Sequence, residues 1–150
     1  MVKNKKDFLI ILQARQSSTR FPNKVLKKIF NIPLIIFLLK RLNKCKKVNQ
    51  VVTVIPKNEK NKNLKKILKK NNFDFFEGSE ANVLERFYLC AKKFEPKNII
   101  RITADCPLTD PGMIDNFIKI FQKKKLIICQ MEIHPHFQMV LILKFLNLVP

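Results

Sequence analysis

The stretch that decides the fold is FLIILQARQSSTRFPNK, residues 8–24, in which an apolar run is followed by a polar and basic segment. A short, uninterrupted run of aliphatic residues is typical of a strand that is buried on both faces, as in a parallel sheet. The run Phe8–Leu12 therefore predicts a buried strand, and the residues after Gln13 predict a loop at its carboxyl end.

Further runs of the same kind follow, and helical patterns separate them. Gln50–Ile55 is rich in β-branched residues and stops at Pro56, Asn98–Thr103 is a third run, and Phe73–Phe76 is a shorter candidate. Strands that alternate with helices of ten or more residues predict an α/β fold with a mostly parallel sheet, helices on both faces and ligands at the carboxyl ends of the strands. Four segments show helical periodicity with one apolar face: Pro33–Leu42, Glu59–Lys70, Asn82–Phe94 and Pro111–Phe121.

The size and composition indicate one globular domain. A chain of 150 residues can bury a sizeable core, and 47% hydrophobic residues with 13 Phe argue against disorder. Its apolar runs are shorter than the ~20 residues that cross a bilayer, and Phe8–Leu12 is too short for a signal-peptide core. We therefore expect a soluble, cytoplasmic protein. No CxxC pair suggests a zinc site or a disulfide framework, so we expect free thiols at Cys45, Cys90, Cys106 and Cys129.

The charge is strongly basic, with a formal net charge of +19 from 30 Lys and Arg against 11 Asp and Glu. Such an excess raises the possibility of nucleic-acid binding. Most of it is lysine interleaved with asparagine, as in residues 57–63, and both residue types have A-rich codons. We therefore favour a base-composition origin over a selected polyanion patch, although the field would still attract a nucleoside triphosphate.

The loop after the first strand contains the first candidate site. Arg15, Arg20 and Lys24 lie there with the hydroxyl side chains of residues 17–19, at the edge where an open α/β sheet binds ligands. Three cations and several donors in one loop predict a triphosphate-binding site. The glycines of a Walker loop and of a Rossmann GxGxxG motif are absent. A solvated basic loop is the alternative.

The second candidate segment is RITADCPLTDP, residues 101–111, at the end of a predicted interior strand. A carboxylate directly after a buried strand, such as Asp105, can hold Mg²⁺ against phosphate oxygens. The alternative is that Asp105 or Asp110 caps the following helix. For Asp110, which directly precedes Pro111, we favour capping.

The third candidate segment is EGSEANVLERF, residues 77–87, and it is weaker by itself. Ser79 or Asn82 could cap the helix that follows. Arg86 is equally an i,i+4 partner for Asn82 and a ligand on the phosphate side.

Taken together, these segments resemble one family. From Phe8 to about Phe121 the chain contains IILQARQSSTRFPNKVL, IPLIIFLLKRL, VVTVIP, FEGSEANVLERF and RITADCPLTDP in unbroken order. The ordered set is similar to the cytidylyltransferases related to CMP-KDO synthetase and CMP-sialate synthetase, most closely the spore coat polysaccharide biosynthesis protein F branch.

The resemblance implies a three-layer, Rossmann-like nucleotide-diphospho-sugar transferase fold in which residues 1–125 bind CTP. The implied reaction is attack by a hydroxyl of an acidic sugar on the α-phosphorus of CTP, which yields a CMP-sugar and pyrophosphate for polysaccharide or glycan biosynthesis. A homodimer is expected, and neither a membrane nor nucleic acid is an expected partner. The residues implied to bind CTP are Ala14, Arg15, Ser18, Arg20 and Lys24, with Asp105 as the Mg²⁺ ligand and Arg15, Lys24 and Asp105 as catalytic residues.

The loop after the first strand departs from the family pattern at two positions. Glycine is common in this family at the positions that match Ser17 and Asn23. Its absence here predicts a loop with less backbone freedom.

The pattern changes after Lys125. Residues 126–150 have no glycine and one acidic residue, and they contain a His134-Pro135-His136 triplet and the apolar run Met139–Leu143. Members of the family continue with a segment like Asn-Gly-x-Pro-Pro-x-Phe-Pro-Asp-Gly-x-Asp-x-Glu, which carries a further metal ligand and much of the sugar pocket. We therefore interpret the chain as truncated, with an aberrant tail.

We hypothesise that the tail from Ile127 is the right gene translated in the wrong frame. Methionine has a single codon, so a shift of two bases converts both Met131-Glu132 and Met139-Val140 into glycine. Both glycines then fall at the spacing of the family segment.

Other functions remain open at this point. The chain could be an inactive fragment, a basic nucleic-acid-binding module or a protein that interacts through its apolar tail. The histidine triplet has too few ligands for a metal site, and Met139–Val149 is too short to span a membrane.

Overall fold

The computed structural model describes residues 7–16, 21–125, 128–131 and 140–144. Four helices, eight strands and two short 3₁₀ helices are found in this part of the chain. In chain order they are β1 (Phe8–Gln13), η1 (Lys24–Leu26), β2 (Lys28–Ile29), β3 (Ile32–Pro33), α1 (Leu34–Leu42), β4 (Gln50–Pro56), η2 (Glu59–Asn61), α2 (Lys62–Lys70), β5 (Phe75–Gly78), α3 (Val83–Phe94), β6 (Asn98–Thr103), α4 (Pro111–Lys123), β7 (Ile128–Met131) and β8 (Val140–Lys144).

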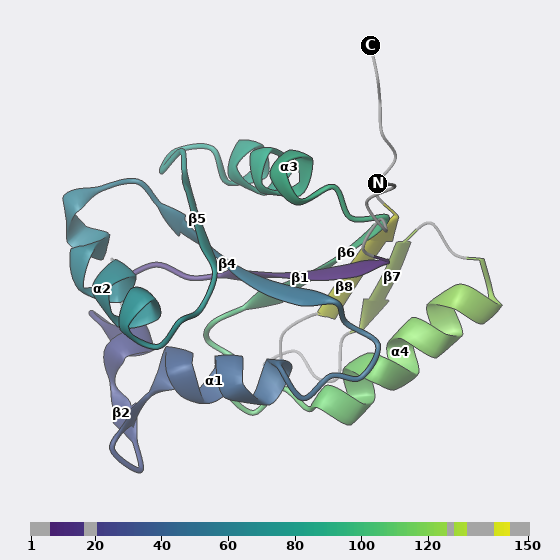
Figure 1. The fold of residues 1–150 in the computed structure, drawn as a ribbon, viewed down its shortest axis with the longest axis horizontal. Coiled ribbons are helices and arrows are strands. Elements are labelled where there is room, and N and C mark those ends of the chain that lie inside the picture. The colour runs from purple at the N-terminus through teal and green to yellow at the C-terminus, as the bar shows by residue number, and fades with distance from the viewer. Residues whose placement is uncertain (1–6, 17–20, 126–127, 132–139, 145–150) are drawn as a thin grey trace.

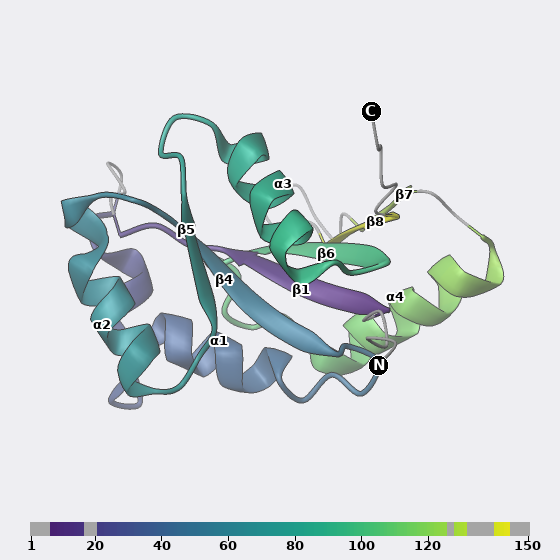
Figure 2. The same ribbon diagram turned by 45° about the horizontal axis from the view of Figure 1, so that its top comes forward.

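The main sheet has the strand order β5-β4-β1-β6-β8-β7. Strands β5, β4, β1 and β6 are parallel to one another, and β8 and β7 continue the sheet antiparallel. Helices α1, α2 and α4 cover one face and α3 covers the other (Figure 1), and the turned view of Figure 2 shows the same three layers. The predicted α/β fold with a mostly parallel sheet and helices on both faces is confirmed.

Strand β1 lies in the middle of the core, which explains its uninterrupted apolar sequence. Its even-numbered residues, such as Ile10 and Leu12, pack toward α1, α2 and α4, and its odd-numbered residues Leu9 and Ile11 pack toward α3. All four side chains are 0% exposed. Burial on both faces of a strand leaves no place for a polar side chain until the sheet ends.

Some boundaries differ from the predictions. Strand β5 begins two residues later than expected, because α2 ends in a turn in which Asn72 has φ 56° and the Phe73 N–H donates to the Leu68 carbonyl at 3.1 Å. Helix α2 begins at Lys62 because η2 precedes it as a 3₁₀ turn.

The hairpin of β2 and β3 was not predicted from the sequence. Its two central residues, Phe30 and Asn31, have φ of 48° and 61°, as two-residue hairpins of matching twist require. Asparagine tolerates this conformation, but phenylalanine rarely adopts it, so the sequence carries no glycine signal for the turn.

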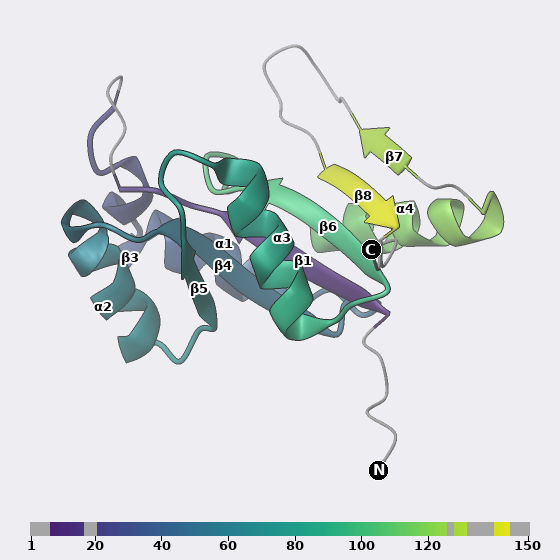
Figure 3. The ribbon, with the colours of Figure 1, turned by 90° about the horizontal axis from the view of Figure 1, so that it is seen from above.

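The described residues after Lys125 form two strands. Strand β8 pairs antiparallel with β6, and β7 pairs with β8 at the edge of the sheet (Figure 3). His134 and His136 lie outside the described residues. No helix in the described part of the chain is long and apolar enough to cross a membrane.

Candidate nucleotide-binding site

The carboxyl ends of β1 and β6 bring two of the predicted site residues to the same edge of the sheet. The register pairs Gln13 with Thr103, so Arg15 and Asp105 each lie two residues beyond a matched pair. The Ala104 N–H donates to the Gln13 carbonyl at 2.9 Å, which extends the pairing beyond the strands. Both Arg15 and Asp105 are exposed. A cation and a carboxylate thus lie exposed at the carboxyl edge, where open α/β sheets bind ligands.

Ala14 is the residue on which the chain leaves β1. Its N–H donates to the Val54 carbonyl of β4 at 3.1 Å, and the residue is 2% exposed. Its small side chain packs in the core, so Ala14 would contribute backbone rather than side-chain atoms to a ligand.

The loop that follows is anchored at Gln16 by a buried asparagine. The Gln16 N–H donates to Oδ1 of Asn61 at 2.8 Å, and the Leu64 N–H donates to Oε1 of Gln16 at 3.3 Å. Asn61 is 2% exposed, and its Nδ2 donates to the Pro56 carbonyl at 3.1 Å. Asn61 therefore ties the start of the loop to the carboxyl end of β4.

The end of the loop, just before Lys24, comes back to Gln16. The Asn23 N–H donates to the Gln16 carbonyl at 3.3 Å, and Lys24 begins η1 directly afterwards with a half-buried side chain. Asn23 has φ 57°, a conformation that glycine adopts freely and asparagine tolerates. At this position asparagine therefore holds the backbone in a conformation that favours glycine. Ser17, Ser18 and Arg20 lie outside the described residues, so the roles of Ser18 and Arg20 remain predictions.

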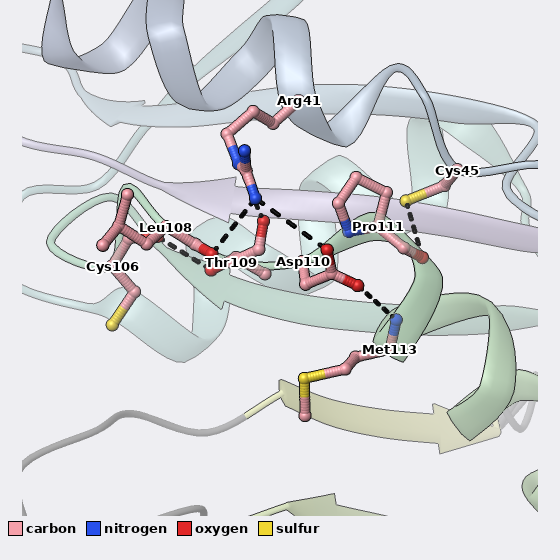
Figure 4. A network of polar contacts seen from close by, with 8 residues as sticks. All are labelled: Arg41, Cys45, Cys106, Leu108, Thr109, Asp110, Pro111 and Met113. Atoms are coloured by element: carbon pink, nitrogen blue, oxygen red, sulfur yellow. Dashed lines mark hydrogen bonds and ion pairs between the residues drawn. The ribbon is translucent and has the colours of Figure 1, made fainter.

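The segment between Asp105 and α4 is held by a polar network around Arg41 (Figure 4). Arg41 Nε donates to the Thr109 carbonyl at 3.2 Å, and its Nη2 lies 3.9 Å from Oδ2 of Asp110. Oδ1 of Asp110 accepts the Met113 N–H at 2.8 Å, so Asp110 caps α4 as predicted. These contacts fix the backbone that follows Asp105.

The cysteines whose side chains the structure describes form neither a disulfide nor a metal-binding cluster. Cys45, Cys90 and Cys106 are free thiols, as predicted, and the side chain of Cys129 lies outside the described residues. Burial raises the pKa of both Cys45 and Cys90 to about 12, and Asp115 and Asp110 add to the shift at Cys45. Both buried thiols are therefore protonated and belong to the core.

Of the two roles weighed for Arg86 in the third segment, the structure does not show the side-chain pairing with Asn82. Arg86 is 2% exposed, and its Nη1 donates to the carbonyl of Ser79 rather than to Asn82. The side chain of Asn82 caps α3 instead, by accepting the Glu85 N–H at 2.9 Å. Arginine side chains are rarely this deeply buried. The burial of Arg86, which the sequence does not show, distinguishes it from the exposed basic residues of the chain.

Comparison with known proteins places this geometry in a family. The cytidylyltransferase family model matches residues 9–136. Spore coat polysaccharide biosynthesis protein SpsF of Bacillus subtilis is 35% identical over 117 aligned residues, which cover 75% of this chain and 49% of that protein. Among solved structures, a cytidylyltransferase from Leptospira borgpetersenii has a TM-score of 0.85 at 26% identity, over 93% of this chain and 60% of that one.

A second solved structure shares the fold at lower identity. CMP:2-keto-3-deoxy-manno-octonic acid synthetase, solved in complex with CTP, has a TM-score of 0.71 at 17% identity, over 81% of this chain and 50% of that one. The chain spans about half the length of the curated relatives that it matches. The family model runs from the second residue of β1 through β7, and it includes the loop of Arg15 and Lys24 and the turn of Asp105. The chain belongs to the cytidylyltransferase family.

Proposed function

We propose that this chain is the nucleotide-binding part of a cytidylyltransferase that transfers CMP from CTP to a hydroxyl of an acidic sugar and releases pyrophosphate. Family membership supports the use of CTP. The similarity to SpsF supports a role in polysaccharide biosynthesis. The similarity to CMP:2-keto-3-deoxy-manno-octonic acid synthetase, an enzyme whose name gives an acidic sugar, supports that class of acceptor.

One structural observation carries the proposal. The pairing of Gln13 with Thr103 brings Arg15 and Asp105 to adjacent strand ends, and the Asn23–Gln16 hydrogen bond returns Lys24 to the start of the same loop. Two cations of one loop and one carboxylate of the turn after β6 therefore belong to segments that lie at one edge of the sheet. This combination suits a triphosphate that is bound with a metal ion.

The proposed reaction makes a defined electrostatic demand on these residues. A bond forms between the sugar oxygen and the α-phosphorus, the bond from that phosphorus to the bridging oxygen breaks, and pyrophosphate leaves with the electron pair. The hydroxyl proton is lost to solvent or to a base. Arg15 and Lys24 would neutralise the negative charge that grows on the leaving pyrophosphate, and this stabilisation is larger in the transition state than in bound CTP.

Asp105 fits a role as a magnesium ligand. Mg²⁺ in nucleotide sites is commonly held by one or two carboxylates, with waters and substrate phosphates as the remaining ligands. Among the described residues no three acidic, histidine or cysteine side chains gather, so Asp105 would act with the phosphates rather than within an all-protein cage. When bound, the ion would neutralise phosphate charge and make the α-phosphorus more electrophilic.

Calorimetric titration with CTP and with ATP, each with and without Mg²⁺, tests the proposal. Asp105→Asn removes the charge and keeps the size of the side chain. Asp7→Asn is the matched control, because Asp7 is an exposed carboxylate at the other edge of the sheet. It pairs with Lys97 at 2.7 Å, and the two residues directly precede the amino ends of β1 and β6.

We expect CTP to bind more tightly than ATP and Mg²⁺ to strengthen the binding of CTP. Asp105→Asn should abolish the effect of Mg²⁺, and Asp7→Asn should leave it unchanged. Equal, weak binding of both nucleotides that does not respond to Asp105→Asn would show nonspecific attraction to lysine charge and would contradict the proposal.

A further inference from the structure

Arg86 is a buried cation with an incomplete set of partners. It is 2% exposed; its Nη1 donates to the Ser79 carbonyl, but its Nε has no hydrogen-bond partner. No ion pair joins Arg86 to a carboxylate among the described residues. A buried charge without a counterion is costly, because it loses its hydration and gains little in return. The folded chain therefore holds a cation that a bound anion would stabilise.

The position of this cation is set by the end of β5. A Cβ added at Gly78 would lie 2.8 Å from Cγ of Arg86 and 3.2 Å from its Cβ, so only glycine lets the Arg86 stem pass. The hydrogen bond from Nη1 of Arg86 to the Ser79 carbonyl then holds the guanidinium next to the first residue after β5. Arg86 is therefore directed to the carboxyl edge of the sheet, which is the edge of the candidate site.

Arg15 lies close enough to Arg86 to affect it electrostatically. Burial lowers the pKa of Arg86, Glu80 acts in the opposite direction, and Arg15 lowers that pKa further. Arg86 belongs to α3, and Arg15 follows β1, whose odd-numbered residues Leu9 and Ile11 pack toward that helix. Gln13, two residues before Arg15, accepts a hydrogen bond from Arg101 at 3.0 Å, and Arg101 lies over the Phe87 ring of α3. The positive charge of Arg15 therefore adds to that of Arg86 near this edge, and a bound anion would reduce the repulsion between the two groups.

We propose that Arg86 is a phosphate-binding residue that acts together with Arg15, and that the polyphosphate chain of the nucleotide supplies its missing partner. The inference rests on the proposed function for the identity of the nucleotide. A polyphosphate carries several negative charges, whereas the carboxylate of a sugar acid carries one, so the polyphosphate compensates two arginines better. A guanidinium also donates parallel hydrogen bonds to phosphate oxygens.

Calorimetric titration with inorganic pyrophosphate and with CTP tests this role. Arg86→Met keeps the apolar stem and removes the charge, Arg86→Lys keeps the charge and removes the planar set of donors, and Lys97→Met is the control at the amino end of β6. Loss of one charge-assisted contact should lower the affinity of Arg86→Met for both ligands by roughly tenfold or more. Arg86→Lys should recover part of this loss, and Lys97→Met should bind as the wild type does.

Gly78→Ala gives a second, independent variant. The new Cβ would push the Arg86 stem aside without changing any charge, so we expect it to weaken pyrophosphate binding as well. Thermal unfolding without ligand separates binding from folding. Arg86→Met removes an unpaired buried charge and should unfold at the same temperature as the wild type or higher, whereas a structural arginine would leave the variant less stable.

The outcomes separate this inference from the proposed function. If a folded Arg86→Met variant binds pyrophosphate as tightly as the wild type does, or the wild type binds none, the role of Arg86 is overturned. If the variant loses pyrophosphate but the wild type does not prefer CTP to ATP, the phosphate-binding role stands and the proposed nucleotide specificity fails.

Discussion

Replacing Asn61 with alanine should destabilise the fold far more than the same change at Asn63. Both belong to the lysine- and asparagine-rich segment 57–63, but Asn61 is 2% exposed and Asn63 is exposed. The Asn61 side chain accepts the Gln16 N–H at 2.8 Å and donates to the Pro56 carbonyl at 3.1 Å. Asn61→Ala leaves both backbone groups without these partners.

The expected magnitude follows from these two bonds. A hydrogen bond contributes about 1 kcal/mol net, and a buried polar group left unsatisfied costs about 1–3 kcal/mol. The half-buried Gln16 N–H loses its partner, whereas the Pro56 carbonyl still accepts the Asn58 N–H at 3.1 Å, so we expect a loss of about 1–3 kcal/mol for Asn61→Ala. Asn63→Ala should change the stability by no more than about 0.5 kcal/mol, as is usual for exposed positions.

Urea unfolding followed by circular dichroism measures both variants. The midpoint should fall for Asn61→Ala with little change in the slope, because the folded state remains compact. CTP titration of the same samples should show weaker binding, since Gln16 begins the nucleotide loop. Equal unfolding free energies for Asn61→Ala and Asn63→Ala would refute the reasoning and would leave the whole asparagine-rich segment without a structural role.

Three other predictions concern the edges of the site, the thiols and the tail. Asp110→Ala should lower the unfolding free energy by about 1 kcal/mol through the lost cap of α4, and Asp110→Asn should lower it less; equal urea midpoints for the wild type and Asp110→Ala would contradict this. Burial raises the pKa of Cys45 and Cys90 from 9.0 to about 12, so the stability that these protonated thiols contribute is present below pH 9 and falls as the pH rises toward 12. The wild type should therefore have a lower urea midpoint at pH 10 than at pH 8, and changing both cysteines to alanine should make this difference smaller. A difference of the same size in the double variant would show that the two thiols do not cause it. Sequencing the DNA should show that the frame offset by two bases from Ile127 encodes the family segment Asn-Gly-x-Pro-Pro; an offset frame that cannot encode it would end the hypothesis.

The local sequence was sufficient for most of the regular elements. Strands β1, β4 and β6 lie where the apolar runs predicted them, because a strand buried on both faces tolerates no polar interruption. The four helices lie where the apolar faces predicted them, to within a few residues at their ends. The β2–β3 hairpin was missed because its turn uses Phe30 and Asn31 in place of the glycine that marks such turns.

The candidate site was predicted in part. Arg15 and Asp105 could be found because a polar residue directly after a buried strand must lie at the carboxyl edge, and the register then brings them together. The capping role of Asp110 followed from its place before Pro111. The role of Asn61 and the burial of Arg86 could not be predicted, and the choice between the two roles weighed for Arg86 stayed open, because each residue has exposed neighbours of the same chemical type along the chain.

The sequence by itself determined the α/β class, the positions of the buried strands along the chain and the family, because these depend on local residue patterns. Only the tertiary structure decided which asparagine anchors the nucleotide loop and which arginine is buried without a counterion. Gln16 and Asn61 are 45 residues apart, and they meet only because β1 and β4 are adjacent in the sheet. Arg86 is enclosed only because α3 packs against the end of β5 at a residue without a side chain.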